Sequence, residues 1–244
     1  MKQLVVLLLS VICVQLSISQ NISPNKLFVE GLRTTMTRYN EVGIVKGTTI
    51  ATHQAASKSG QNIAINTTSN YIDANGGTQV SKEVGYKLNT NAVTNVYSFF
   101  IDMKYFLPVN VAYQYRNYNL TTSGSAYDIP SQVTIGQSLN NLTMNYTFVP
   151  SVAGFSSAST TIQFMNRVID KREKITVPAG TYMCYVISEI VEIKTNILTK
   201  QRVKRWINPE IGFVKIEVSD MNGNLIESEQ LTQFQLPNTV NSSK

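Results

Sequence analysis

The sequence has 244 residues, a formal net charge of +6 at pH 7, 43% hydrophobic residues and only 15% charged residues. This composition supplies enough apolar side chains for one core, and it excludes collagen-like, coiled-coil and disulfide-rich classes. With one histidine and two cysteines, the chain has few of the side chains on which metal sites and nucleophilic catalysis depend.

The N-terminus has the pattern of a secretory signal peptide. Lys2 supplies a positive charge, residues 4–16 form an apolar run, and the small residues Ser17 and Ser19 follow. The run is shorter than the roughly 20 residues that a membrane-spanning helix needs. We therefore expect residues 1–19 to be a signal peptide that is cleaved after Ser19.

Cleavage would leave one cysteine in the mature chain. Cys13 lies inside the signal peptide, and Cys184 lies in the middle of a long apolar segment. A single cysteine cannot form an internal disulfide. The stability of an exported chain of this kind must then come from core burial and from backbone pairing.

The rest of the chain repeats with a period of two, which is typical of β-strands. Runs rich in Val, Ile, Thr, Tyr and Phe are separated by Gly, Asn and Pro. The predicted strands are 28–39, 44–54, 61–72, 78–89, 94–101, 111–118, 131–136, 139–148, 160–177, 181–195, 198–207, 211–219 and 224–236.

One short helix and several tight turns interrupt these strands. The helix is predicted over 101–107, where Asp102 can cap it and Pro108 ends it. Pro178-Ala179-Gly180 and Asn222-Gly223 predict hairpin turns, because Pro fixes φ and Gly accepts a positive φ.

Thirteen strands without alternating helices predict an all-β antiparallel meander. Long strands twist, and a large twisted sheet tends to close on itself. We therefore expect a long-stranded barrel or open half-barrel. It would form a single domain over 20–236, followed by a flexible tail over 237–244.

Segment 181–195 is apolar on both of its faces in its first half. Tyr185 and Ile187 lie on one face, and Cys184 and Val186 lie on the other. An antiparallel strand normally keeps one face wet, so both faces must be covered here. A well-packed core strand and a ligand-lined concave surface both fit this pattern.

Several phrases of the sequence together resemble a known family of exported bacterial proteins. They are 129–131, 136–139, Arg167, 174–185, Trp206, 211–217, 222–225 and 231–234. The chain is similar to the TapB family and to DUF3108-like proteins, with the Pro-Ala-Gly-Thr pattern of 178–181 at its centre. The resemblance covers about 28–234. It departs from the family at 206–212, where Trp-Ile-Asn-Pro-Glu-Ile-Gly replaces Trp-Tyr-Ala-x-Gly-Val-Gly.

The resemblance implies a long-stranded barrel or half-barrel, similar in outline to the lipoprotein carriers of the Lol system. It also implies a place in the envelope of a Gram-negative bacterium, in the periplasm or secreted. It carries over no catalytic residues.

The sequence offers no recognisable catalytic set. His53 is the only histidine, and Cys184 has no histidine near it in sequence. Glu189 and Glu192 fall on opposite faces of one strand, so they cannot pair as general acid and base. No phosphate-binding loop, dinucleotide motif or nucleic-acid module is present. We expect a protein that is not an enzyme, with no cofactor, no metal and no nucleic-acid partner.

The first hypothesis for function is a carrier that shelters an acyl chain or lipid in its half-barrel. The candidate ligand-binding residues are Tyr185, Ile187, Val191, Trp206, Phe213 and Val214. The alternative is a structural or assembly protein, whose open sheet edge pairs with a strand of another envelope protein. Neither hypothesis requires a transmembrane segment after cleavage.

Overall fold

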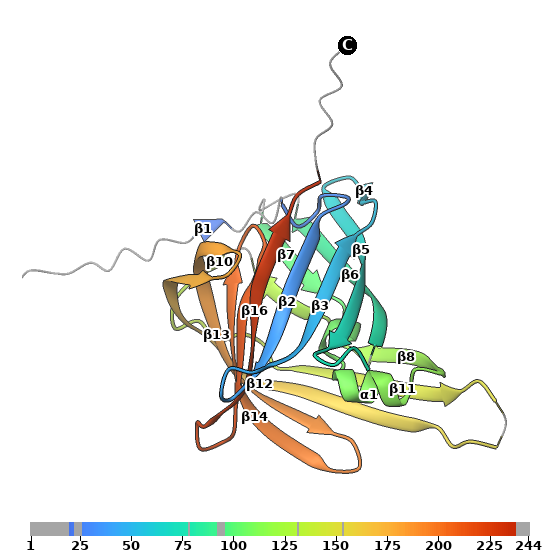
Figure 1. Cartoon of the computed structure of the whole chain (residues 1–244). Coiled ribbons are helices and arrows are strands. Elements are labelled where there is room, and N and C mark those ends of the chain that lie inside the picture. The colour runs from blue at the N-terminus through green and yellow to red at the C-terminus, as the bar shows by residue number, and fades with distance from the viewer. Residues whose placement is uncertain are drawn as a thin grey trace, which may run out of the picture.

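The computed structural model describes residues 20–21, 26–77, 79–91, 96–130, 132–152 and 154–237. Fourteen strands form one large antiparallel sheet (Figure 1), and β1 pairs with β10 in a separate two-stranded sheet. The strands are β1 (Gln20–Asn21), β2 (Arg33–Asn40), β3 (Val45–His53), β4 (Ser57–Ser59), β5 (Asn62–Asp73), β6 (Gln79–Asn91), β7 (Val96–Ile101), β8 (Tyr118–Gly124), β9 (Tyr127–Pro130), β10 (Gln132–Val133), β11 (Leu142–Pro150), β12 (Ala158–Val177), β13 (Gly180–Lys194), β14 (Leu198–Asn208), β15 (Gly212–Ser219) and β16 (Leu225–Gln235).

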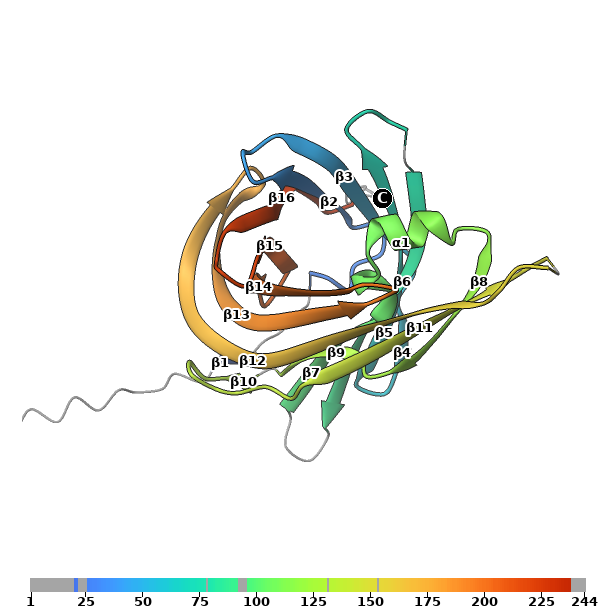
Figure 2. The same cartoon turned by 90° about the horizontal axis from the view of Figure 1, so that it is seen from below.

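The large sheet is an open half-barrel. Its order is β8-β11-β12-β13-β14-β15-β16-β2-β3-β5-β6-β7-β9, with β4 paired to β5. Most strands that are neighbours in the sheet are also consecutive in the chain. The pairing of β16 with β2 joins the C-terminal part of the chain to its N-terminal part in the middle of the sheet. The sheet curls around a central space without closing (Figure 2), since β8 and β9 do not pair. The predicted all-β meander and half-barrel are confirmed.

Two short helices lie across the open side of the sheet. The 3-10 helix η1 (Met103–Phe106) is capped by Asp102, whose side chain accepts from the Lys104 N–H at 2.7 Å. The predicted short helix near Pro108 is therefore confirmed. The α-helix α1 (Val109–Gln114) begins directly after Pro108, and it contacts β6.

The prediction of a strand over 111–118 is wrong, because α1 occupies the first half of this segment and β8 begins only at Tyr118. Residues 113–116 alternate as Tyr-Gln-Tyr-Arg, which gives a period of two by chance in a segment this short. Pro108 fixes φ at the helix start and favours a first helical turn there.

Smaller differences concern the ends of strands. The segment predicted to open the first strand at 28 forms turns, and β2 begins at Arg33. The strand predicted over 131–136 is reduced to the two residues of β10. Strands β4 and β9 were not predicted, because three or four residues carry too little periodicity. Residues 1–19 and 238–244, which hold the predicted signal peptide and nearly all of the tail, lie outside the described residues.

Both faces of β13 are buried between Cys184 and Ile187, as its composition predicts. Tyr185 and Ile187 belong to the main core on the concave side. The other face belongs to a second apolar cluster: Val177, Cys184, Val186, Trp206, Ile211, Val214 and Leu231. The tip of the β12–β13 hairpin reaches β16, where the Ala179 N–H donates to the Leu231 carbonyl at 3.2 Å. The curled sheet thus covers the second face of β13 itself.

Within the part of the chain that the structure describes, no helix has the length and apolar character needed to cross a membrane.

Candidate functional site: a cavity in the half-barrel

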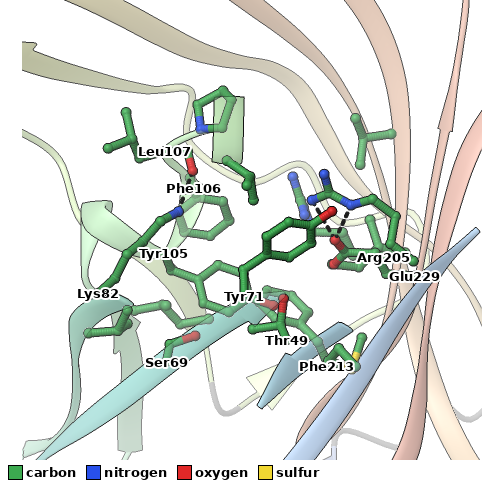
Figure 3. Close-up of a pocket in the computed structure, with 18 of the residues that line it drawn as sticks. Thr49, Ser69, Tyr71, Lys82, Tyr105, Phe106, Leu107, Arg205, Phe213 and Glu229 are labelled. Atoms are coloured by element: carbon green, nitrogen blue, oxygen red, sulfur yellow. Dashed lines mark hydrogen bonds and ion pairs between the residues drawn. The ribbon is translucent and has the colours of Figure 1, made fainter. Parts of the chain in front are cut away.

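The concave side of the sheet holds a partly open cavity of about 460 Å³ (Figure 3). Both halves of the sheet line it, and the segment from Tyr105 to Val111 supplies one wall. The cavity reaches Thr195 and Glu227, which lie beside the β13–β14 and β15–β16 turns, and at its other end it reaches Leu27 and Ile211. Its volume is in the range of small-molecule binding sites.

Aromatic rings form much of the apolar lining. Tyr86 and Phe99 stack with ring centroids 6.0 Å apart, and Tyr105 lies 5.3 Å from Phe213. Phe106, from η1, packs edge-on against Phe213 at 6.4 Å. Tyr86, Phe99 and Phe213 alternate with outward-facing positions along their strands, whereas Tyr105 and Phe106 reach the cavity from η1.

A polar band, formed by Arg38, Tyr71, Lys82 and Glu229, crosses the cavity wall on the side of the β15–β16 turn. Arg38 on β2 and Glu229 on β16 are register partners, and Nη2 and Nε of Arg38 lie 2.6 and 2.8 Å from Glu229 Oε1. Burial alone would lower the pKa of Arg38, but Glu229 and Glu227 raise it above its ordinary value. Arg38 therefore stays charged and is held by a carboxylate. The hydroxyl of Tyr71, in the same band, donates to the Lys46 carbonyl at 3.1 Å.

Lys82 is a second cation in the same wall, and it has a different kind of partner. Its Nζ donates to the Leu107 carbonyl at 2.5 Å, where η1 ends and the chain crosses the open side (Figure 3). Burial lowers the pKa of Lys82 to about 8, and the positive charge of Arg38 acts in the same direction. Among the described residues, no carboxylate lies within ion-pair distance of this ammonium group.

A buried charge cluster stands behind the cavity wall. Arg205 faces the cavity and donates from Nε to Glu189 Oε1 at 2.6 Å. Glu189 Oε2 accepts from the Tyr127 hydroxyl at 3.1 Å and lies 3.3 Å from Arg167 Nε. Arg167 also donates to Asp128 Oδ1 and to the Asn140 carbonyl at 3.0 and 2.8 Å. Glu189 thus pairs with both arginines, although Arg167 Nε makes no hydrogen bond among the described residues, and the cluster ties β13, β14, β12 and β9 together behind the wall.

The cavity contains two of the six residues that the sequence analysis proposed for ligand binding. Val191 and Phe213 line it. Tyr185 and Ile187 lie in the main core on the same face of β13 but do not reach the cavity. Trp206 and Val214 do not line it either, because both pack in the second apolar cluster. Trp206 Nε1 donates to Glu173 Oε1 at 2.6 Å instead.

None of the six residues proposed from the sequence belongs to the polar band. A signal for Lys82 exists, because it shares the inward face of β6 with Val80, Val84 and Tyr86. A lysine among apolar residues on one strand face stands out once that face is known to point inward. Arg38 and Glu229 are far apart in sequence, and only the β16–β2 pairing brings them together.

His53 is buried, with 4% of its surface exposed, and it lines the apolar end of the cavity. Its Nδ1 lies 2.6 Å from the Leu27 carbonyl, which can only accept, so Nδ1 carries the proton. Burial lowers the pKa of His53, against the opposite effect of the bond to Leu27. Among the described residues, no group of three or more His, Cys, Asp or Glu side chains is arranged to hold a metal.

Two solved structures are similar to this fold. One is a Bacteroides fragilis protein assigned as exported and having a YmcC-like fold; its TM-score is 0.70 at 17% identity, over 88% of this chain and 99% of that one. The other is a Parabacteroides distasonis protein assigned as a lipoprotein; its TM-score is 0.66 at 14% identity, over 87% of this chain and 100% of that one. At sequence identities this low, the structural similarity shows a shared fold and nothing about function.

Among curated proteins, none matches the sequence. The DUF3108-like family, in contrast, matches residues 29–231. This span runs from the turn before β2 into β16, so it includes both walls of the cavity. The narrower resemblance to TapB proteins stays a prediction. Because the match covers most of the sequence, the chain belongs to the DUF3108-like family.

Proposed function

We propose that this protein is a non-enzymatic carrier, which shelters a hydrophobic or lipid ligand inside its half-barrel. The observation that carries the proposal is the partly open cavity of about 460 Å³, whose wall is aromatic and aliphatic outside its charged and polar positions. A core packed for stability alone would fill such a volume with its own side chains. Contiguous apolar surface left accessible in this way is typical of a binding site.

The proposal includes export and cleavage of residues 1–19. The signal-peptide pattern supports export, and so do the assignments of the two similar proteins as exported and as a lipoprotein. We place the mature chain in the periplasm of a Gram-negative bacterium. N-terminal sequencing of the protein from a periplasmic extract should begin at Gln20. A chain that is recovered intact from the cytoplasm would contradict this placement.

The free energy gained by burying the hydrocarbon chain of a ligand is large enough to support binding. Burying a ten-carbon chain contributes about 8 kcal/mol at about 0.8 kcal/mol per CH₂. Association and ordering costs reduce this figure substantially. A net affinity in the micromolar range or weaker is therefore expected, which suits a carrier that must release its ligand.

Native mass spectrometry and thermal unfolding test the proposal directly. The purified protein should carry a lipid-sized adduct, or its melting temperature should rise when single-chain lipids are added. Thr49→Trp fills the cavity from β3, while Thr48→Trp places the same ring on the opposite face of that strand. The first variant should lose the thermal shift, and the second should keep it. An adduct-free protein that no lipid stabilises would overturn the proposal.

The alternative proposal is assembly by strand addition. The outer sides of β8 and β9 are unpaired within the large sheet, so two edges stand open to another strand. A photocrosslinking residue at the exposed Asn119 of β8 should then capture one defined envelope protein. The same residue at Lys87, on the outer face of the inner strand β6, should capture none.

A further inference from the structure

Lys82 occupies an unusual place for a lysine. It lies on the inward face of β6 between Val80 and Val84, both of which line the cavity. An ammonium group on such a face loses water, and this loss is costly unless an anion replaces the water. The Leu107 carbonyl takes one of its donors, and an ammonium group has three. Two donors remain for another acceptor.

Among the residues that the structure describes, the other two cations that line the cavity, Arg38 and Arg205, already have carboxylate partners. Arg38 forms an ion pair with Glu229, and Glu227 adds a second negative charge on the side of Arg38. Arg205 is closed on Glu189. Of the cations that the described residues place in the cavity wall, Lys82 alone has no carboxylate at ion-pair distance.

We propose that the cavity selects single-chain amphiphiles with an anionic head, which Lys82 binds while the chain lies against the aromatic lining. The head is a carboxylate or a phosphate, since both accept from an ammonium group. This inference rests on the proposed carrier function and names its class of ligand.

The order of residues along β6 supports this arrangement. The inward positions beyond Lys82 are Val84 and Tyr86, and Phe99 stacks on Tyr86 from β7. The four residue-to-residue steps from Lys82 to Tyr86 span about 13 Å at about 3.3 Å per residue. This apolar stretch fits the chain of the amphiphile. Ser69 on β5 is the register partner of Lys82 and offers a hydroxyl group at the level of the head, and Thr49 on β3 lies level with Val80, one inward position nearer to the β5–β6 turn (Figure 3).

The test compares three ten-carbon probes by isothermal titration at pH 7: decanoate, decyl phosphate and 1-decanol. The wild-type protein should bind one or both anions at least about tenfold more tightly than decanol, which corresponds to about 1.4 kcal/mol. Preference for decanoate over decyl phosphate, or the reverse, identifies the head. Lys82→Met should lose the preference for anions and keep its affinity for decanol. Lys82→Arg should retain much of the preference.

Lys87→Met is the matched control, because Lys87 lies exposed on the outer face of the same strand. It should bind all three probes as the wild type does. Equal binding of anions and decanol by the wild type, or an unchanged preference in Lys82→Met, would overturn the anionic head and leave the carrier function standing. Failure of all three probes to bind would count against the carrier function itself.

A pH series on the wild type keeps the test independent of any variant. Decanoate is ionised throughout the range from pH 7 to pH 10, whereas Lys82 has a pKa of about 8 in the free protein. The affinity of the wild-type protein for decanoate should fall above pH 8, while its affinity for decanol should not change with pH. Parallel curves for the two probes would contradict a role for Lys82.

Discussion

The Arg205 guanidinium and the Glu189 carboxylate meet on neighbouring strands, with Nε and Oε1 2.6 Å apart and both side chains almost wholly buried. Four aromatic rings surround Arg205, with centroids 5.2 to 5.9 Å from its Cζ: Phe106, Tyr127, Phe164 and Phe213. Burial alone would lower the pKa of Arg205, and Glu189 raises it. One charge pair thus fixes where the aromatic wall stands.

Replacing Glu189 by alanine should therefore be strongly destabilising. It leaves Arg205 and Arg167 buried without their shared carboxylate, and breaking a buried pair costs about 3–5 kcal/mol. Urea unfolding should show a loss of this size in the free energy of unfolding. The control is Glu192→Ala on the same strand, whose partner Lys200 is largely exposed; it should cost about 1 kcal/mol or less. Similar losses in both variants would contradict the role of Glu189.

The single histidine predicts a loss of stability at mildly acidic pH. The folded protein holds His53 neutral, with a pKa below 6.5, whereas the unfolded chain binds a proton there near pH 6.5. The unfolded state therefore binds more protons as pH falls below 6.5, and the free energy of unfolding declines. Urea unfolding at pH 7 and pH 5 should show a smaller decline in His53→Gln. An equal decline would place the acid sensitivity elsewhere.

Lys82 predicts the same direction of change on the alkaline side, a stability that rises with pH. Its pKa is about 8 in the folded protein and about 10.5 in the unfolded chain. Between these values the unfolded state binds more protons, so the contribution of this lysine to stability rises with pH. The difference in unfolding free energy between Lys82→Met and wild type should shrink from pH 7.5 to pH 9.5. A constant difference would show that the ammonium group is well solvated.

Cys184 should be unreactive in the folded protein. The thiol is buried, and burial raises its pKa to about 12. Because the thiolate is the reactive form, iodoacetamide at pH 8 should leave the peptide that contains Cys184 unmodified. The same peptide should be fully alkylated in 8 M urea, as peptide mass mapping can show. Rapid labelling of the native protein would mean that the second apolar cluster opens readily.

The sequence predicted the architecture because strand periodicity is a local property. The alternation of 181–195 indicated two buried faces, and β13 has them. Asn222-Gly223 predicted a turn, and Gly223 has a φ of +94° between β15 and β16. Each of these features depends on a few consecutive residues, so no knowledge of the sheet order was needed.

The candidate site was harder to predict, because it depends on which strands become neighbours. Trp206 was proposed as a lining residue, but Val203, Arg205 and Ile207 take the inward positions of β14, so the alternation of the strand turns Trp206 to the other face. Trp206 then packs with Val186 in the second cluster. Lys82 gains its role from the Leu107 carbonyl across the open side of the sheet, a contact that no local pattern encodes.

The gap between β8 and β9 gives the cavity one wall of a different kind. Elsewhere, widening the cavity would break rows of hydrogen bonds between strands. At the gap, the crossing segment is tied to the sheet by side-chain hydrogen bonds, among them those from the Tyr146 hydroxyl to the Met103 carbonyl and from Lys82 Nζ to the Leu107 carbonyl. If the protein is the carrier proposed above, a wider ligand would be accommodated by a shift of this segment alone, and tolerance of ligands of different width would follow from the architecture.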